Sequence, residues 1–347
     1  MNTAVPVVVV GASAGGVTAL SALCAGLPAH FPAAVLVVLH IAADAPSLLP
    51  NILGRAGPLP AHHPVSGEPL RPGHIYVAPP DYHLLVEPGG VTLTRGPKEN
   101  RSRPSVDALF RSAAYTYGPR VIGVILSGML DDGVSGLYTI KRRGGQAVVQ
   151  RPEEAEYDSM PATALREVEV DHVVSAHEMG ALLTRLVTQN FFPPEDNTMT
   201  HDEERRLDVE VAINREDSAF REGVTALGRP SLLTCPECQG ALVQIDEGPL
   251  LRFRCHTGHG YTASTLLSEV SKSVEEKAYQ VLRTMEEEVM LLQRLGQQHE
   301  KAGRPDEAQG FYTKAREVMA STDGIRALAM SNQRLSTESI LMQRSED

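Results

Sequence analysis

The stretch Val7-Val-Val-Val-Gly-Ala-Ser-Ala-Gly-Gly16 decides how the first half of the chain folds. Four β-branched residues run into a glycine-rich turn, and a helical segment, Val17–Leu27, follows at once. This order predicts a buried strand, a tight turn and a helix. The turn fits G-x-S-x-G, in which a serine hydroxyl is exposed where a strand turns sharply into a helix. The helix N-terminus behind Ser13 can stabilise negative charge on a reacting oxygen.

A phosphate-binding loop and a purely structural connection are the alternatives for this turn. The dinucleotide fingerprint is G-x-G-x-x-G, followed about 20 residues later by an acidic residue. Ser13 stands where its second glycine belongs, and the next apolar strand, Ala34–Leu39, ends in His40 rather than Asp or Glu. Both departures favour a nucleophilic serine over a dinucleotide site.

Composition excludes several classes of protein. The 347 residues carry a formal net charge of -11, which disfavours nucleic acid and anionic membranes as partners. No apolar run approaches the ~20 residues that span a bilayer, so we expect no membrane insertion. The N-terminus has no basic segment ahead of an apolar one, which argues against a signal peptide. We therefore expect a cytoplasmic protein.

Residues 1–189 show strands alternating with helices. A β-hairpin is expected over His83–Glu87 and Val91–Thr94, and a helix with Ser105 as its N-cap over Leu109–Tyr117. The alternation predicts an α/β fold with a doubly wound, mostly parallel sheet. The strands expected in that sheet are Val7–Val10, Val35–Leu39, Gly73–Pro80 (a strand running into a turn), Arg120–Leu126, Ala147–Gln150 and Asp171–Ser175.

Three polar positions directly follow apolar strands of this sheet: Ser13, His40 and the pair Asp131/Asp132. Ligands of such sheets bind beyond the carboxyl ends of the strands, so the fold can bring these side chains together. Acyl transfer needs a serine nucleophile, a histidine that takes its proton, and a carboxylate that orients the imidazole. The chain order Ser, His, Asp is not diagnostic, because geometry defines a triad.

Each member of this set has a structural alternative. His40 at a strand end can be an interior histidine with satisfied hydrogen bonds, and Asp131 or Asp132 can cap the helix that follows. Four other histidines compete with His40, but their proline-rich or alternating contexts predict exposed side chains. They are His62, His63, His74 and His83.

Residues 6–187 resemble the catalytic domain of chemotaxis protein-glutamate methylesterases of the CheB type. The resemblance covers a whole domain, with several motifs in the right order. They are Val10–Gly16, Val38–His40, Ile75–His83, Arg103–Asp107, Leu126–Gly133, and Gln150–Pro161 with Glu153, Glu156 and Met160.

The resemblance implies that Ser13 is the nucleophile, His40 the general base and Asp132 the residue that orients the histidine. Asp132, rather than Asp131, directly precedes the glycine of the family pattern G-M-x-x-D-G. The implied reaction is hydrolysis of γ-glutamyl methyl esters on chemoreceptor helices, with glutamine deamidation as a second activity and no catalytic metal or cofactor. Ala14 stands where the family usually has threonine, which loses a side-chain contact but keeps a backbone N–H for an oxyanion hole. The regulated members carry a receiver domain before the catalytic domain, and we expect a stand-alone form without one, which phosphorylation within the same chain cannot control.

Residues 190–232 are polar and charged, and are expected to form a linker. Pro193–Asn197 is typical of a connection, and Glu203–Phe220 is expected either as a short helix or as a mobile segment.

Residues 233–262 contain a second chemical motif, a zinc-ribbon-like module. Cys235-Pro-Glu-Cys238 and Cys255-His256-Thr-Gly-His259 flank a predicted hairpin, Ala241–Ile245 and Leu250–Arg254. Zinc takes four thiolate or imidazole ligands in a tetrahedron, and knuckles at the ends of a hairpin supply two each. The expected ligands are Cys235, Cys238, Cys255 and His259, with His256 as the alternative fourth ligand.

A full ligand set indicates a structural Zn²⁺ rather than a catalytic one. The alternative is a redox-active C-x-x-C, but a third cysteine and nearby histidines argue against it. The same stretch resembles a tail found on some stand-alone members of the methylesterase family.

Residues 263–347 are expected to form a helical tail. From Thr262 to Leu295 apolar residues recur every three or four positions, which predicts a long helix with one apolar stripe. A second helix, about Pro305–Leu335, can fold back on it. The stripe is expected to be core or a dimer seam, with recognition of another signalling protein as the alternative. Its members are Leu266, Leu267, Val270, Val274, Ala278, Val281, Met285, Val289, Leu292 and Leu295.

The sequence as a whole predicts a serine esterase that demethylates chemoreceptor glutamates. An esterase or deamidase acting on another signalling protein is one rival. A non-catalytic signalling scaffold, with the tail as its working part, is the other.

Overall fold

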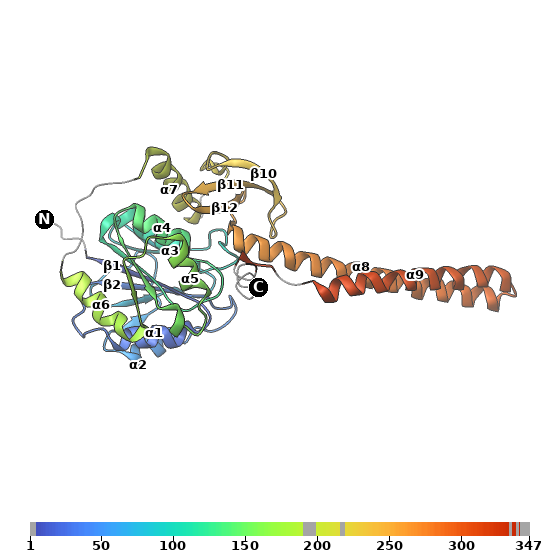
Figure 1. The fold of residues 1–347 in the computed structure, drawn as a ribbon, viewed down its shortest axis with the longest axis horizontal. Helices are drawn as coiled ribbons and strands as arrows, with labels where there is room; N and C mark the ends of the chain where they lie inside the picture. Colours follow the sequence, from blue (N-terminus) through green and yellow to red (C-terminus); the bar gives the residue numbers. More distant parts are fainter. Residues whose placement is uncertain (1–4, 190–198, 216–218, 333–334, 338–339, 341–347) are drawn as a thin grey trace. The chain divides into compact units, whose positions relative to one another are not determined.

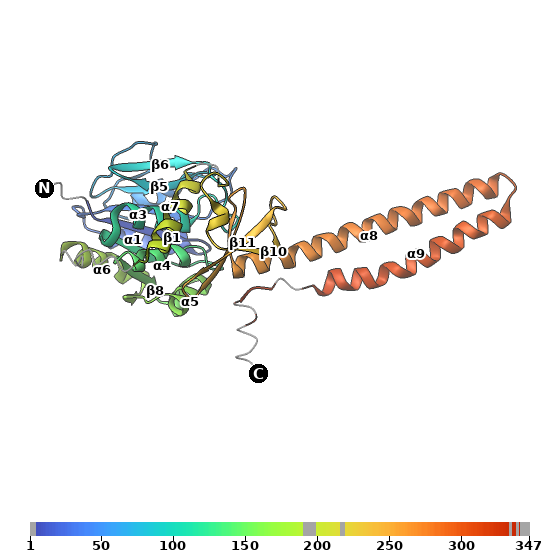
Figure 2. The same cartoon turned by 90° about the horizontal axis from the view of Figure 1, so that it is seen from above.

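The computed structural model describes residues 5–189, 199–215, 219–332, 335–337 and 340 of the chain (Figures 1 and 2). The chain divides into two compact units between Thr265 and Leu266, and each is described by itself.

The first unit is built on a seven-stranded sheet with the order β3-β4-β2-β1-β7-β8-β9, in which every neighbouring pair is parallel. β1 and β2 are buried along their whole length, as continuous apolar strands without alternation require. The prediction of a doubly wound, mostly parallel sheet is confirmed. The strands are β1 (Val7–Ala12), β2 (Ala34–Leu39), β3 (Ala61–His62), β4 (Ile75–Val77), β7 (Val121–Ile125), β8 (Gln146–Gln150) and β9 (His172–Val174).

Helices cover both faces of this sheet (Figure 1). Val8 and Val10 belong to the core on the side of α1, α2 and α6, whereas Val7 and Val9 belong to the core on the side of α3, α4 and α5. Successive side chains of a strand point to opposite faces, so one run of four valines serves both cores. The helices are α1 (Gly16–Ala25), α2 (Leu49–Ala56), α3 (Val106–Tyr117), α4 (Val134–Arg142), α5 (Ser159–Glu167) and α6 (Ala176–Thr188).

Short elements complete this part of the chain. The predicted hairpin is present as β5 (His83–Glu87) and β6 (Gly90–Thr94), and it packs on α3. Three single 3₁₀ turns are η1 (Gly118–Arg120), η2 (Pro152–Glu154) and η3 (Val224–Ala226).

A second, antiparallel sheet follows in the same unit, with the order β10-β11-β12-β13. Its central pair, β11 (Ala241–Glu247) and β12 (Leu250–Cys255), is the predicted hairpin, and β10 (Arg229–Thr234) and β13 (Gly260–Thr262) extend it on both sides. We call residues 229–262 the ribbon.

A helix, α7 (His201–Asn214), lies between the two sheets in sequence, within the segment predicted as a linker. Thr200 and Glu203 form a capping box at its start. The predicted connection Pro193–Asn197 lies outside the described residues.

The second unit is a helical hairpin made by α8 (Ala263–Lys301), from Leu266 onward, and α9 (Pro305–Ser331). The chain reverses at Gly303, which has a φ of 74° that favours glycine. The predicted second helix ends at Ser331 rather than Leu335, because Asn332 has extended backbone and donates its side-chain N–H to the Ser271 carbonyl at 3.0 Å.

The predicted apolar stripe of α8 is only partly buried. Ala278 and Val289 are buried, but Val270, Val274 and Val281 are exposed. α9 contributes small buried residues at seven-residue intervals and therefore covers only a narrow strip of α8. These residues are Ala308, Ala315, Thr322 and Ala329.

Candidate active site

Ser13 lies in the turn that joins β1 to α1, at the carboxyl end of the central strand. Its backbone N–H donates to the Ser127 carbonyl at 3.0 Å, which ties the turn to the one that follows β7. Gly15 has a φ of 71°, and a Cβ there would come within 2.6 Å of Ser127 Oγ. The tight turn that the sequence predicted therefore requires glycine at Gly15, two positions after the serine.

His40 directly follows β2, the neighbour of β1 in the sheet. Its backbone N–H donates to the Ala12 carbonyl at 3.2 Å, so the histidine is held beside the end of β1. Its ring Nδ1 lies 3.2 Å from Ser13 Oγ, and its Nε2 lies 2.7 Å from Asp132 Oδ2. The sheet thus brings together three side chains that are separated by up to 119 positions in sequence (132 minus 13).

Asp132 is the most enclosed of the three, with a side chain that is 4% exposed against 19% for His40. Five donors surround its carboxylate. Oδ2 accepts from His40 Nε2 and from the Val106 N–H at 2.8 Å, and Oδ1 accepts from Asn100 Nδ2 at 3.0 Å, Ser105 Oγ at 3.0 Å and the Asp107 N–H at 3.3 Å. Because Val106 and Asp107 open α3, the carboxylate also lies at the positive end of that helix.

Two neighbouring carboxyls have opposite pKa shifts here. Burial raises the pKa of Asp132, but the hydrogen bond and charge of His40 and the donors Val106 and Asn100 bring it below its ordinary value. Burial, followed by repulsion from Asp132, holds the pKa of Asp107 well above its ordinary range. The pair therefore keeps its negative charge on Asp132, the member that faces the histidine.

Asp131 points away from His40. Its Oδ1 accepts from the hydroxyls of Thr262 at 2.7 Å and Thr265 at 3.2 Å. The alternative role of Asp131 or Asp132, as a cap of the helix that follows, is wrong. That helix, α4, has Gly133 at its N-cap position, and no side chain caps it. Asp132 instead binds the first N–H groups of α3.

Ser105 does not act as the side-chain cap that the sequence predicted. It occupies the N-cap position of α3, but its hydroxyl donates to Asp132 and no side-chain bond caps the helix. The Asp132 carboxylate takes over the capping role, because an anion binds the free N–H groups of a helix start more strongly than a hydroxyl does.

The prediction of exposure is wrong for His83, which is completely buried. Its Nε2 donates to the Pro97 carbonyl at 3.0 Å and its Nδ1 accepts from the Ser105 N–H at 3.3 Å, and burial lowers its pKa. His62, His63 and His74 are partly exposed. The prediction failed because β5 does not alternate between buried and exposed residues: its first four residues, His83 among them, are all buried.

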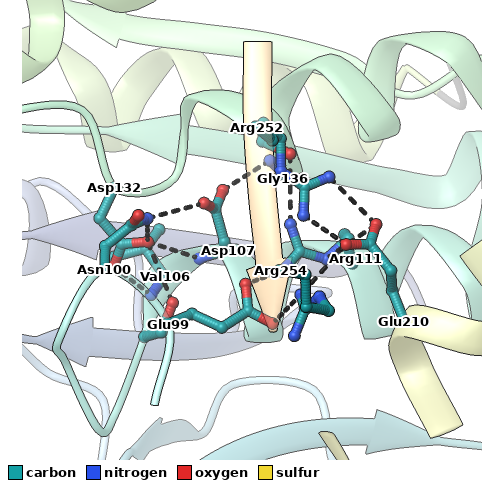
Figure 3. A network of polar contacts seen from close by, with 12 residues as sticks. Glu99, Asn100, Val106, Asp107, Arg111, Asp132, Gly136, Glu210, Arg252 and Arg254 are labelled. Atoms are coloured by element: carbon teal, nitrogen blue, oxygen red, sulfur yellow. Dashed lines mark hydrogen bonds and ion pairs between the residues drawn. The ribbon is translucent and has the colours of Figure 1, made fainter. Parts of the chain in front are cut away.

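Sequence reasoning missed Asn100. This residue belongs to no repeated pattern and lies in a loop, where its φ of 48° is one that asparagine tolerates better than most residues. Its side chain bridges the two carboxyls, donating to Asp107 Oδ2 at 3.2 Å as well as to Asp132 (Figure 3). The only sequence signal was the preference of asparagine for left-handed backbone.

A second cluster lies in the ribbon. One donor atom from each of Cys235, Cys238, Cys255 and His259 lies within 4.8 Å of all the others. The Sγ atoms of Cys238 and Cys255 are 3.6 Å apart, and His259 Nδ1 is 3.7 Å from Cys235 Sγ. A tetrahedron with Zn–S bonds of about 2.3 Å places its sulfurs about 3.8 Å apart, so the donor set fits a metal ion. His256 is exposed and lies outside the cluster.

All four cysteines of the chain are free thiols in the structure. Among the described residues, no helix combines the length and apolar character needed to cross a bilayer.

Comparison with known proteins identifies the first part of the chain. Residues 8–183 match the family model described as CheB methylesterase. This range contains Ser13, His40 and Asp132, and it ends before α7 and the ribbon begin.

Several curated relatives match the same region. A protein-glutamate methylesterase/protein-glutamine glutaminase of Myxococcus xanthus is 40% identical over 179 residues, which are 51% of this chain and 51% of the relative. One of Anaeromyxobacter dehalogenans is 46% identical over 160 residues, 46% of this chain and 47% of the relative. A Leptospira interrogans protein, provisionally named for the same two activities, is 39% identical over 184 residues, 53% of this chain and 95% of the relative.

A solved structure shares the fold. The crystal structure of the Thermotoga maritima CheB methylesterase catalytic domain has a TM-score of 0.51 and 32% sequence identity, and the match covers 52% of this chain and 98% of that one.

Proposed function

Because the chain belongs to the CheB methylesterase family, whose relatives are named as ester hydrolases, we propose that it hydrolyses γ-glutamyl methyl esters on methylated chemoreceptors. The observation that carries the proposal is the hydrogen-bonded series from Ser13 through His40 to Asp132 at the carboxyl edge of the sheet. Ser13 is the nucleophile, His40 the general base and acid, and Asp132 the residue that orients the imidazole.

The geometry supports acyl transfer in two halves. Ser13 Oγ attacks the ester carbonyl while its proton passes to His40 Nδ1, 3.2 Å away and within reach of a general base. The tetrahedral intermediate expels methoxide, which takes the proton back from His40 and leaves as methanol. Water then attacks the acyl-serine, again giving a proton to His40, and the glutamate carboxylate is released as Ser13 regains its hydrogen.

The hydrogen bonds also select the tautomer of the histidine. Nδ1 must be free to accept from Ser13, so the proton lies on Nε2, which donates to Asp132 Oδ2 at 2.7 Å. Five donors and a lowered pKa keep Asp132 ionised, so the imidazolium formed during the reaction has a fixed counter-charge. The N-terminus of α1 behind Ser13 favours negative charge on the developing oxyanion.

Glutamine deamidation uses the same intermediate. Attack of Ser13 on a side-chain amide forms the same acyl-serine, with ammonia in place of methanol as the leaving group. The names of the relatives pair these two activities.

We assign the ribbon cluster to a structural Zn²⁺ held by Cys235, Cys238, Cys255 and His259. Four protein donors fill a tetrahedral site and leave no position for water or substrate, so such an ion supplies folding energy and no chemical step. Neighbouring thiols that bind metal rather than pair as disulfides suit a reducing compartment, so we place the protein in the cytoplasm.

Methanol release from methylated chemoreceptor tests the proposal. The wild type is expected to release methanol in proportion to the glutamate formed, and Ser13→Ala is expected to release none above background. Ser21→Ala, which removes an exposed hydroxyl from α1, is the matched control and is expected to behave as wild type.

Two other results would redirect the assignment. If a serine-directed fluorophosphonate labels Ser13 but no methanol appears, the substrate is another protein ester or amide. If neither labelling nor methanol is seen with the folded, metal-loaded wild type, the chain is a scaffold and the proposed function is wrong.

A further inference from the structure

The side-chain amide of Asn100 connects the ribbon with the candidate active site. Its Nδ2 donates to Asp132 Oδ1 at 3.0 Å, and its Oδ1 accepts from the Thr262 backbone N–H at 2.9 Å. Thr262 ends β13, the last strand of the ribbon. One amide therefore touches the carboxylate that faces His40 on one side and the ribbon backbone on the other.

The Thr262 N–H determines which way this amide points. A backbone N–H can only donate, so it selects the oxygen of the amide and turns the NH₂ group toward the carboxylates. The reverse orientation would place the amide oxygen against the ionised Asp132 and leave the Thr262 N–H facing an NH₂ group. Both contacts would then be lost, and both groups are enclosed.

The backbone of β13 also holds the loop that carries Asn100. The Asn100 N–H donates to the Gly260 carbonyl at 2.8 Å, and the Gly260 N–H donates to the Lys98 carbonyl at 3.2 Å. The loop thus pairs with β13 for a short distance, which fixes Asn100 at its positive φ. Gly260 directly follows His259, one of the four candidate metal ligands.

A buried network of ion pairs ties the same elements together (Figure 3). Arg254 of β12 is fully buried and donates to Glu99 Oε1 at 2.7 Å, to Glu210 Oε1 of α7 at 3.0 Å and to the Gly258 carbonyl at 2.7 Å. Glu99 also pairs with Arg111 of α3. Because Glu99 immediately precedes Asn100, the network anchors the loop from its other side.

We propose that Asn100 is a positioning residue for Asp132, and that β13 of the ribbon sets the orientation of its amide. The ribbon is then a support for the active site rather than a separate appendage. This inference rests on the proposed function, because it gives Asn100 a role through Asp132 and His40.

The test replaces the side-chain amide of Asn100 by residues that can keep the same backbone conformation. Asn100→Asp retains an acceptor for the Thr262 N–H but replaces the donor to Asp132 by a third carboxyl group. Asn100→Gly deletes the side chain and suits the positive φ. Both are expected to lower kcat for methyl-ester hydrolysis about 10- to 100-fold with little change in KM, the loss usual for a group that orients a catalytic residue.

A spectroscopic readout separates positioning from simple loss of stability. The proton between His40 Nε2 and Asp132 is expected to give a far-downfield NMR resonance, identified by its absence in His40→Ala. We expect this resonance to shift or broaden in both Asn100 variants. Arg206→Met, which removes an exposed contact between α7 and the ribbon, is expected to leave the resonance and kcat unchanged.

The outcomes distinguish the inference from the proposed function. If both Asn100 variants are folded and keep wild-type kcat and an unshifted resonance, the inference is overturned. If the resonance shifts in the variants but wild type releases no methanol from chemoreceptor, Asn100 positions Asp132 and only the proposed substrate is wrong. If Asn100→Asp does not fold, kcat and the NMR resonance of Asn100→Gly alone decide whether the inference holds.

Discussion

The candidate active site and the candidate metal cluster of the ribbon are assembled in opposite ways. Ser13, His40 and Asp132 lie in the loops that follow β1, β2 and β7, and the hydrophobic cores on both faces of the sheet hold those strands in place. The cluster instead gathers Cys235, Cys238, Cys255 and His259 from two short turns at one end of a small sheet. A site supported by a large core is formed by folding alone, whereas we expect a module as small as the ribbon to depend on its ion pairs and on the proposed metal.

The largest expected effect is the loss of catalytic activity when a side chain of the candidate active site is removed. Ser13→Ala and His40→Ala are each expected to lower kcat/KM for methyl-ester hydrolysis about 10⁴- to 10⁶-fold, because we propose that they are the nucleophile and its base, which act as one unit. The double variant is expected to be no more than a few-fold worse than either single one. Methanol release measures all three, and losses that multiply in the double variant would show that the two side chains act independently.

Breaking the buried network is expected to cost stability. Arg254→Met leaves Glu99 buried with less compensating charge and is expected to reduce the free energy of unfolding by about 3–5 kcal/mol. Arg229→Met, which removes an exposed pair with Asp246, is the matched control and is expected to cost about 0–1 kcal/mol. Urea unfolding measures both, and equal losses would mean that the ribbon is attached mainly by other contacts.

Low pH is expected to weaken the buried ion pairs that attach the ribbon to the rest of the unit. Burial raises the pKa of Glu210, but Arg252, Arg111 and Arg254 lower it to about 2. A folded pKa below the unfolded one contributes stability that is present above about pH 4.5 and is lost as the pH falls toward 2.

The contribution of Glu210 is up to about 3 kcal/mol. Unfolding free energies measured between pH 6 and pH 3 are expected to fall more steeply for wild type than for Glu210→Gln. Parallel curves would assign the acid sensitivity to other carboxylates.

The smallest expected effect is that of metal removal from the ribbon on the reactivity of the candidate active site. Treatment with a chelator, which removes metal from the proposed ribbon site, is expected to slow fluorophosphonate labelling of Ser13 about tenfold, because β13 then holds Asn100 less firmly. Zn²⁺ is expected to restore the rate and Mg²⁺ is not, since thiolates bind zinc and not magnesium. Unchanged labelling in protein shown to be metal-free would make the ribbon independent of the active site.

Sequence patterns predicted the structure correctly where a short stretch of the chain determines its own conformation. The valine run of β1, the G-x-S-x-G turn and the spacing of the cysteines each predicted local structure correctly, because short-range geometry decides them. Sequence patterns failed to predict whether a side chain is buried or exposed where this depends on another part of the chain that packs against it. His83 is buried where its ring meets the Pro97 carbonyl and the Ser105 N–H, and Val274 of α8 is exposed because the buried residues of α9 form only a narrow seam.

By itself the sequence determined the fold class of the first half, the family to which it belongs, and the residue types available for chemistry at each strand end. The family pattern implied Asp132 rather than Asp131, and in the structure Asp132 faces His40 while Asp131 binds Thr262. Only the tertiary structure decided that Asn100 stands between the Asp132 carboxylate and the ribbon. Adjacent residues in a turn point in different directions, and a loop asparagine gains its partners from segments more than 30 and 160 positions away. Such contacts depend on how separate elements pack, which no local pattern encodes.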